Sequence, residues 1–218
     1  MSLTFSVLCY NKAIKIYLVI SNSTILWENK MEILREINIT KDKKLAIWLN
    51  IISLPTFFLF FYLFYLLGLK IQPPTIENVI YTIHLGKLFL FVLAILAVVI
   101  IHELIHAFFF KLFKPKSKVK FGINWKLGAA YATCPKVTYD RRQMIVISLA
   151  PFIIWSLTLT ILFDMNLLSF PAYVGIASLH ATGCIGDFYY VYLLGIKYAR
   201  KKILAEDTAV GLIIYSKN

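Results

Sequence analysis

The sequence is poor in cysteine, in acidic residues and in charge of either sign. Its three cysteines, Cys9, Cys134 and Cys184, form no C-x-x-C pair and no even set, so they give no sign of a disulfide scaffold or a thiolate zinc site. Charged residues make up only 16% of the 218 residues, whereas apolar residues make up 60%. Because several apolar runs are long enough to cross a bilayer, this composition predicts an integral membrane protein.

The basic residues are informative through their positions. Lys and Arg outnumber Asp and Glu by 23 to 11, which in a soluble protein would suggest a nucleic-acid partner. Beside apolar spans, however, Lys and Arg mark the cytoplasmic loops. They gather in residues 41–44, 111–142 and 197–202. We therefore expect a multi-pass protein of the cell membrane with both termini in the cytoplasm and no nucleic-acid partner.

The apolar runs predict an all-α membrane protein with about four transmembrane helices. The expected spans are residues 45–69, 86–110, 144–163 and 167–196. Between the second and third spans, residues 118–127 alternate polar and apolar side chains, and residues 129–133 are suited to a returning strand. This pattern predicts a short strand-like hairpin in a cytoplasmic loop. Residues 209–215 are a further candidate strand.

The first 30 residues are the least interpretable part of the chain. Their apolar patches are interrupted by Asn11, Lys12 and Lys15, so the patches are too short to span, and no small-residue cleavage site follows. We expect residues 1–30 to form a poorly defined N-terminal extension. Residues 31–218 are then expected to form a single membrane-embedded domain.

The most informative motif is His102-Glu-Leu-Ile-His106, at the end of an uncharged apolar run. Two histidines four residues apart lie on one face of a helix, where both can bind one zinc ion. Glu103 points to the neighbouring flank and can accept a proton from a water molecule that the zinc activates. Ionisable groups inside a span are costly, and they indicate a functional site by default.

The third zinc ligand has two candidates, His180 and Asp187. Catalytic zinc usually takes three protein ligands and keeps one position open. In an uninterrupted fourth helix, Asp187 would lie near the depth of the motif and His180 about two turns deeper. We therefore expect Asp187 to be the ligand and His180 to hydrogen-bond a ligand or a developing oxyanion. His180 stays open as the alternative ligand, and either residue could instead serve helix packing.

The chain resembles the zincin peptidase family of small multi-pass membrane proteins, which is similar to the site-2 proteases. The resemblance covers residues 35–215 and depends on His102-Glu-Leu-Ile-His-Ala107, Lys120-Phe-Gly122, Leu149-Ala-Pro151, Ser178-Leu-His180 and Gly186-Asp187. It implies that His102, His106 and Asp187 hold zinc and that Glu103 is the general base. Site-2 proteases have an Asn-Pro pair ahead of an Asp-Gly pair, whereas here Phe188 follows Asp187.

These observations predict an intramembrane zinc metallopeptidase. We expect it to cleave a membrane protein or peptide near the cytoplasmic face of the lipid bilayer by means of a zinc-activated water. One alternative is a zinc-binding membrane scaffold without turnover. Another is a metal transporter, which the shortage of polar residues in the first and third spans disfavours.

Overall fold

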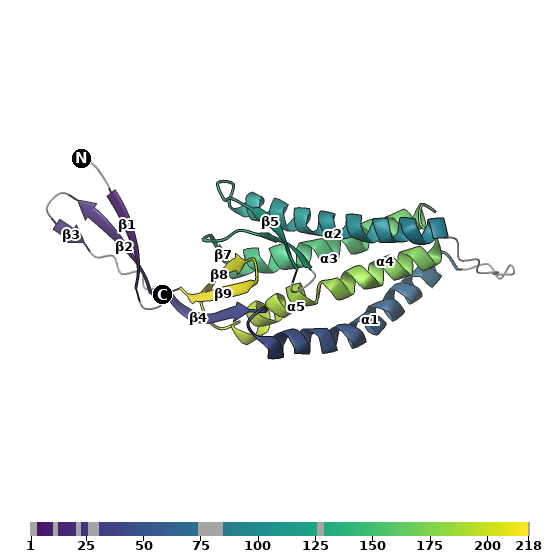
Figure 1. Ribbon diagram of the computed structural model, residues 1–218, viewed down its shortest axis with the longest axis horizontal. Coiled ribbons are helices and arrows are strands. Elements are labelled where there is room, and N and C mark those ends of the chain that lie inside the picture. Colours follow the sequence, from purple (N-terminus) through teal and green to yellow (C-terminus); the bar gives the residue numbers. More distant parts are fainter. Residues whose placement is uncertain are drawn as a thin grey trace.

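The computed structural model describes residues 4–10, 13–20, 23–25, 31–73, 85–125 and 129–217. Its helices lie side by side as an elongated bundle with a small sheet at one end (Figure 1). The helices are α1 (Lys43–Ile71), α2 (Leu85–Phe113), α3 (Arg141–Asp164), α4 (Phe170–Gly183) and α5 (Ile185–Tyr192), followed by a π-helical turn, η1 (Leu193–Lys197).

Three helices are long and apolar enough to cross a membrane: α1, residues Leu88–Phe113 of α2, and α3. They coincide with the first three expected spans. Large apolar side chains on α1 and α2 are exposed, among them Phe58 at 61% and Phe89 at 63%. Such an apolar surface is compatible with contact to lipid.

The fourth expected span, residues 167–196, is an interrupted helix rather than a continuous one. Helix α4 ends at Gly183, and Cys184 separates it from α5, with its backbone N–H 3.2 Å from the His180 carbonyl oxygen. Two glycines, Gly183 and Gly186, flank the break, and glycine is a poor residue for a helix interior. Three of the four expected spans are therefore long apolar helices, and the count of four transmembrane helices is not confirmed.

Local sequence signals set the helix ends. Asp42 caps α1, because its side chain accepts a hydrogen bond of 3.0 Å from the Leu45 N–H. A capping box begins α3, where the Asp140 N–H donates to Gln143 Oε1 at 3.1 Å. At its other end α1 stops just ahead of Pro73, which cannot continue a helix.

A sheet at the end of the bundle corrects the all-α expectation. Strands β4 (Met31–Asn38), β9 (Gly211–Ser216), β8 (Ile203–Thr208) and β7 (Thr138–Asp140) pair antiparallel in that order. Strand β9 matches the candidate strand at 209–215, whereas β4, β7 and β8 were not foreseen. Their pairing joins distant parts of the chain, which a local pattern does not reveal.

The N-terminal segments that the structure describes are also strands: β1 (Thr4–Tyr10), β2 (Ala13–Ile20) and β3 (Ser23–Ile25). Strand β2 pairs with β1 and β3, and it meets β4 through Ala13 opposite Glu32 and Ile14 opposite Met31. The division into an extension and a domain at residue 31 stays a prediction.

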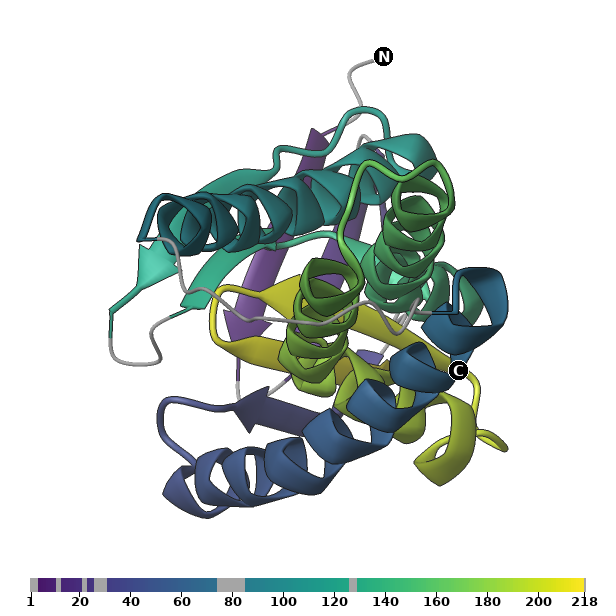
Figure 2. The same cartoon turned by 90° about the vertical axis from the view of Figure 1, so that its right-hand side faces the viewer.

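The hairpin expected between the second and third helices is present as β5 (Lys120–Asn124) and β6 (Ala129–Thr133). It lies alongside α2 (Figures 1 and 2). Gly122 is opposite Tyr131, and a Cβ at Gly122 would lie 2.5 Å from the Tyr131 hydroxyl. The aromatic side chain thus lies across the glycine, an arrangement that fixes the register of the two strands.

Candidate metal centre

Helix α2 presents both histidines of the H-E-x-x-H motif to the interior of the bundle. They are one helical turn apart, and the Nε2 atoms of His102 and His106 are 3.0 Å from each other. The two side chains are 14% and 11% exposed, so both are largely buried yet accessible from a cavity.

A backbone carbonyl of α3 orients His106. The Nδ1 atom of His106 lies 2.9 Å from the carbonyl oxygen of Ile147. A carbonyl can only accept, so Nδ1 carries the proton and Nε2 of the neutral ring keeps its lone pair. The carbonyl is available because Pro151, four residues further along α3, has no N–H to donate to it. The Leu-Ala-Pro sequence thus sets the tautomer of His106.

Asp187, in the first turn of α5, completes a triangle of donor atoms. Its Oδ2 is 3.5 Å from His102 Nε2, and its Oδ1 is 3.5 Å from His106 Nε2. The lone pairs of these groups converge on one region, where a cation would offset their mutual repulsion. Two imidazole nitrogens and one carboxylate oxygen match the donor set of a catalytic zinc site with one position left open. The residues present therefore fit a zinc ion.

His180 contacts Nδ1 of His102, the ring nitrogen that does not face Asp187. Its Nε2 is 3.1 Å from His102 Nδ1, away from the nitrogen that faces Asp187. We expected His180 about two turns beyond the motif, and the structure brings its ring nitrogen to His102 close to the helix break at Cys184. His180 thus lies beside the donor triangle and outside it, where it can hold His102 by a hydrogen bond.

Glu103 lies on the flank of α2 that faces β6. The backbone N–H of Ala132 donates a hydrogen bond to Glu103 Oε2. Glu103 and the donor triangle line the same cavity of about 200 Å³. Within the part of the chain that the structure describes, Glu103 belongs to neither of the residue groups that could hold a metal ion. This position is suitable for a general base that acts on a water in the cavity.

Asp207, on β8, also lines this cavity and was not anticipated from the sequence. Burial raises its pKa to about 7, because the charged carboxylate loses water contacts. The sequence shows only an acid in a basic tail. Its closeness to the motif depends on the pairing of β8 with β7 and β9, which bring the tail back to the bundle.

Comparison with known families supports a zincin-like relationship. The sequence profile of the family described as "Putative zincin peptidase" matches residues 95–201, a segment that contains the part of α2 with the motif, the hairpin, α3, α4 and α5. The match makes this segment similar to a family whose description implies a metallopeptidase with zinc as the metal. Neither the curated proteins nor the solved structures contain a match to this chain.

Proposed function

We propose that the protein is a zinc-dependent intramembrane metalloendopeptidase. The observation that carries this proposal is the convergence of His102 Nε2, His106 Nε2 and an Asp187 carboxylate oxygen beside Glu103. Three donors and an adjacent carboxylate make up the minimal set for metal-assisted hydrolysis. The zincin peptidase profile over residues 95–201 supports the same chemistry.

His102, His106 and Asp187 would hold the zinc ion. When bound, zinc lowers the pKa of a coordinated water towards neutrality and polarises a carbonyl group. Glu103 lies one residue from the first ligand and lines the same cavity, so its carboxylate can accept the proton from the attacking water. The same carboxyl group can then pass the proton to the departing amine.

His180 acts in this proposal as a positioning residue. If the His102 Nδ1–H donates to His180 Nε2, the lone pair of His102 lies on Nε2, the nitrogen that faces Asp187. The carbonyl of Ile147 does the same for His106. Each of the two histidines is thus oriented by a partner outside the donor triangle.

The substrate would be held as an extended strand against β6. The lining of the cavity includes Ala129–Ala132 of β6 and residues 208–211, where β8 turns into β9. In an antiparallel pair, alternate residues direct their backbone groups away from the partner strand. An added peptide strand can use those groups, and unwinding exposes the carbonyls that a helix shields.

We place the active site near the cytoplasmic face of the cell membrane, with both termini in the cytoplasm. The sheet lies at the end of the bundle where α1 and α3 begin and α2 ends (Figure 1). The basic residues of 41–44, 111–120, 136–142 and 197–202 lie in or next to the helix ends and strands at this end. Such a bias supports a cytoplasmic position for that end.

The test is Glu103→Gln in protein reconstituted into lipid vesicles with a panel of single-span peptides. We expect the variant to keep its zinc, measured by elemental analysis, and to lose cleavage, measured by mass spectrometry. Glu36→Gln, which changes an exposed carboxylate on β4, is the matched control and should cleave as the wild type does. Unchanged cleavage by Glu103→Gln would refute the mechanism. A zinc-loaded wild type that cleaves no peptide of the panel would favour the scaffold alternative.

A further inference from the structure

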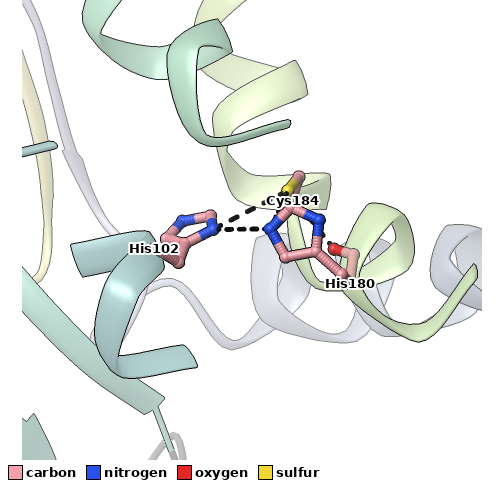
Figure 3. A group of neighbouring side chains, drawn as sticks. All are labelled: His102, His180 and Cys184. Carbon is pink, nitrogen blue, oxygen red and sulfur yellow. Dashed lines mark hydrogen bonds between the residues drawn. The ribbon is translucent and has the colours of Figure 1, made fainter. Parts of the chain in front are cut away.

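A second group of donor atoms lies on the other side of His102. His102 Nδ1 is 3.1 Å from His180 Nε2, and the Cys184 Sγ is 3.9 Å from the first atom and 3.8 Å from the second. Figure 3 shows the three side chains directed towards one another, with His102 contributed by α2 and the other two by the end of α4. The first donor triangle uses Nε2 of the same ring, so one imidazole joins two triangles.

The separation of these atoms suits a tetrahedral metal ion. Bonds of about 2.0–2.1 Å from zinc to nitrogen and about 2.3 Å to sulfur imply ligand separations of roughly 3.3 Å between nitrogens and 3.6 Å between nitrogen and sulfur. The observed separations, 3.1, 3.8 and 3.9 Å, depart from these values by a few tenths of an ångström. Movements of that size are within reach of side-chain rotation alone.

The helix break creates this second group. His180 and Cys184 are four residues apart, so they lie on the same face at the end of α4, while α5 carries Asp187 to the other side of His102. Cys184 is fully buried, and its Sγ is 3.3 Å from the His180 carbonyl oxygen. Among the residues that the structure describes, His180 Nδ1 has no partner, so His180 interacts through Nε2.

A second cavity borders the two imidazoles of this group. This cavity, of about 280 Å³, is lined by residues of α2, α4 and β6, among them both His102 and His180. Apart from Glu103, its other lining residues are apolar or small, and they include Val98, Ile176 and Leu179. The cavity therefore leads to the two imidazoles, and the Cys184 Sγ lies within 3.9 Å of both.

We propose that His102 Nδ1, His180 Nε2 and Cys184 Sγ form a second, inhibitory site for a soft divalent cation such as Zn²⁺ or Cd²⁺. A thiolate and two imidazoles favour such ions over Mg²⁺ or Ca²⁺. On binding, the Cys184 thiol releases its proton to solvent and the sulfur bonds to the metal. The hydrogen bond between His102 and His180 is replaced by two metal–nitrogen bonds.

Inhibition follows from the chemistry of a single imidazole. A neutral ring has one lone pair, so when Nδ1 of His102 binds the second ion its proton lies on Nε2. The first triangle then loses one of its three donors. The two sites therefore compete for His102, and an excess of the soft ion withdraws it from the catalytic zinc. This regulatory consequence rests on the proposed function, whereas binding of the second ion does not.

The experiment is a Cd²⁺ titration of the zinc-loaded full-length protein in detergent. The ultraviolet absorption of a cadmium–thiolate bond reports the second site, and a chromophoric chelator reports released zinc. We expect one equivalent of Cd²⁺ to produce the thiolate absorption and to release zinc. Cys184→Ser should lose this absorption and keep its zinc, whereas Cys134→Ser, which changes the other buried cysteine of the described residues, should behave as the wild type.

Three outcomes would overturn the proposal. The first is a thiolate absorption that persists in Cys184→Ser. The second is the absence of that absorption from the wild type, and the third is Cd²⁺ binding at Cys184 with full retention of zinc. His180→Ala gives an independent check and should weaken Cd²⁺ binding by at least tenfold. None of these readouts depends on peptide cleavage, so a failure of the peptidase proposal in the Glu103→Gln test would be seen separately.

Discussion

Replacing Pro151 by alanine should weaken zinc binding while making the protein more stable. Alanine restores an N–H that can donate to the Ile147 carbonyl, the group that now accepts a hydrogen bond of 2.9 Å from His106 Nδ1. The restored backbone hydrogen bond stabilises α3, whereas His106 loses part of the interaction that orients its ring. The two effects have opposite signs, so they can be separated.

The magnitudes follow from the groups involved. A hydrogen bond contributes about 0.5–1.5 kcal/mol to stability in net terms. Loss of a group that hydrogen-bonds a metal ligand typically lowers metal affinity by about 10–100-fold. Because a carbonyl has two lone pairs and can be shared, we expect the lower end, about tenfold weaker zinc binding. A proline inside a helix costs about 3 kcal/mol. Alanine has two fewer buried carbons than proline, and the loss of their burial offsets about 1.6 kcal/mol of the stability gained by removing the proline. Metal-free Pro151→Ala should therefore be about 1 kcal/mol more stable than the wild type.

Zinc affinity is measured by competition with a chelator of known affinity, and stability by thermal unfolding of the metal-free protein in detergent. Pro55→Ala is the matched control, because Pro55 also lies inside an apolar helix but is exposed and far from the donor triangle in sequence. It should leave zinc affinity unchanged. If Pro151→Ala gains stability and keeps the full zinc affinity, the carbonyl of Ile147 does not orient His106 and the reasoning fails.

Three further predictions concern single residues. Asp187→Asn should lower zinc affinity by more than about 100-fold, beyond the usual cost of a change outside the ligands, with Asp164→Asn as the control in the same chelator assay. Since burial raises the pKa of Asp207 to about 7, folded metal-free protein holds a proton there that the unfolded chain releases near pH 4. Stability should thus fall as the pH rises from about 4 to about 7, and Asp207→Asn should flatten that slope in thermal unfolding. Gly211→Ala places a Cβ against the Ile37 carbonyl and should destabilise the protein by about 1–3 kcal/mol, measured by the same unfolding assay; an unchanged melting temperature would contradict it.

Local patterns predicted the features that depend on neighbouring residues. The lengths of α1, α2 and α3 follow from uncharged runs, and the hairpin of β5 and β6 follows from alternation. Counting residues to the helix exits also selected Asp187, which the structure places beside the motif histidines. These inferences needed only the regular rise of a helix and the period of a strand.

Features that depend on distant pairing or on a broken helix were not predictable in this way. Strand β4 pairs with β9 from the other end of the chain, and short strands of this kind give a weak local signal. Asp207 reaches the cavity only through that sheet. The position of His180 depended on where a glycine-flanked helix breaks, which glycine content alone does not locate.

The hydrogen bond from the Ala132 N–H to Glu103 has a consequence for the order of events in catalysis. Since this N–H points to Glu103, it is not used by Phe121, the residue opposite on β5, and it lies on the outer edge of β6. A peptide that adds to this edge competes with the carboxylate for the same proton donor. The peptide would replace one hydrogen bond by another at little net cost and set the carboxylate free. Substrate binding would then free the Glu103 carboxylate to act as the base, whereas without substrate the carboxylate would stay hydrogen-bonded to Ala132.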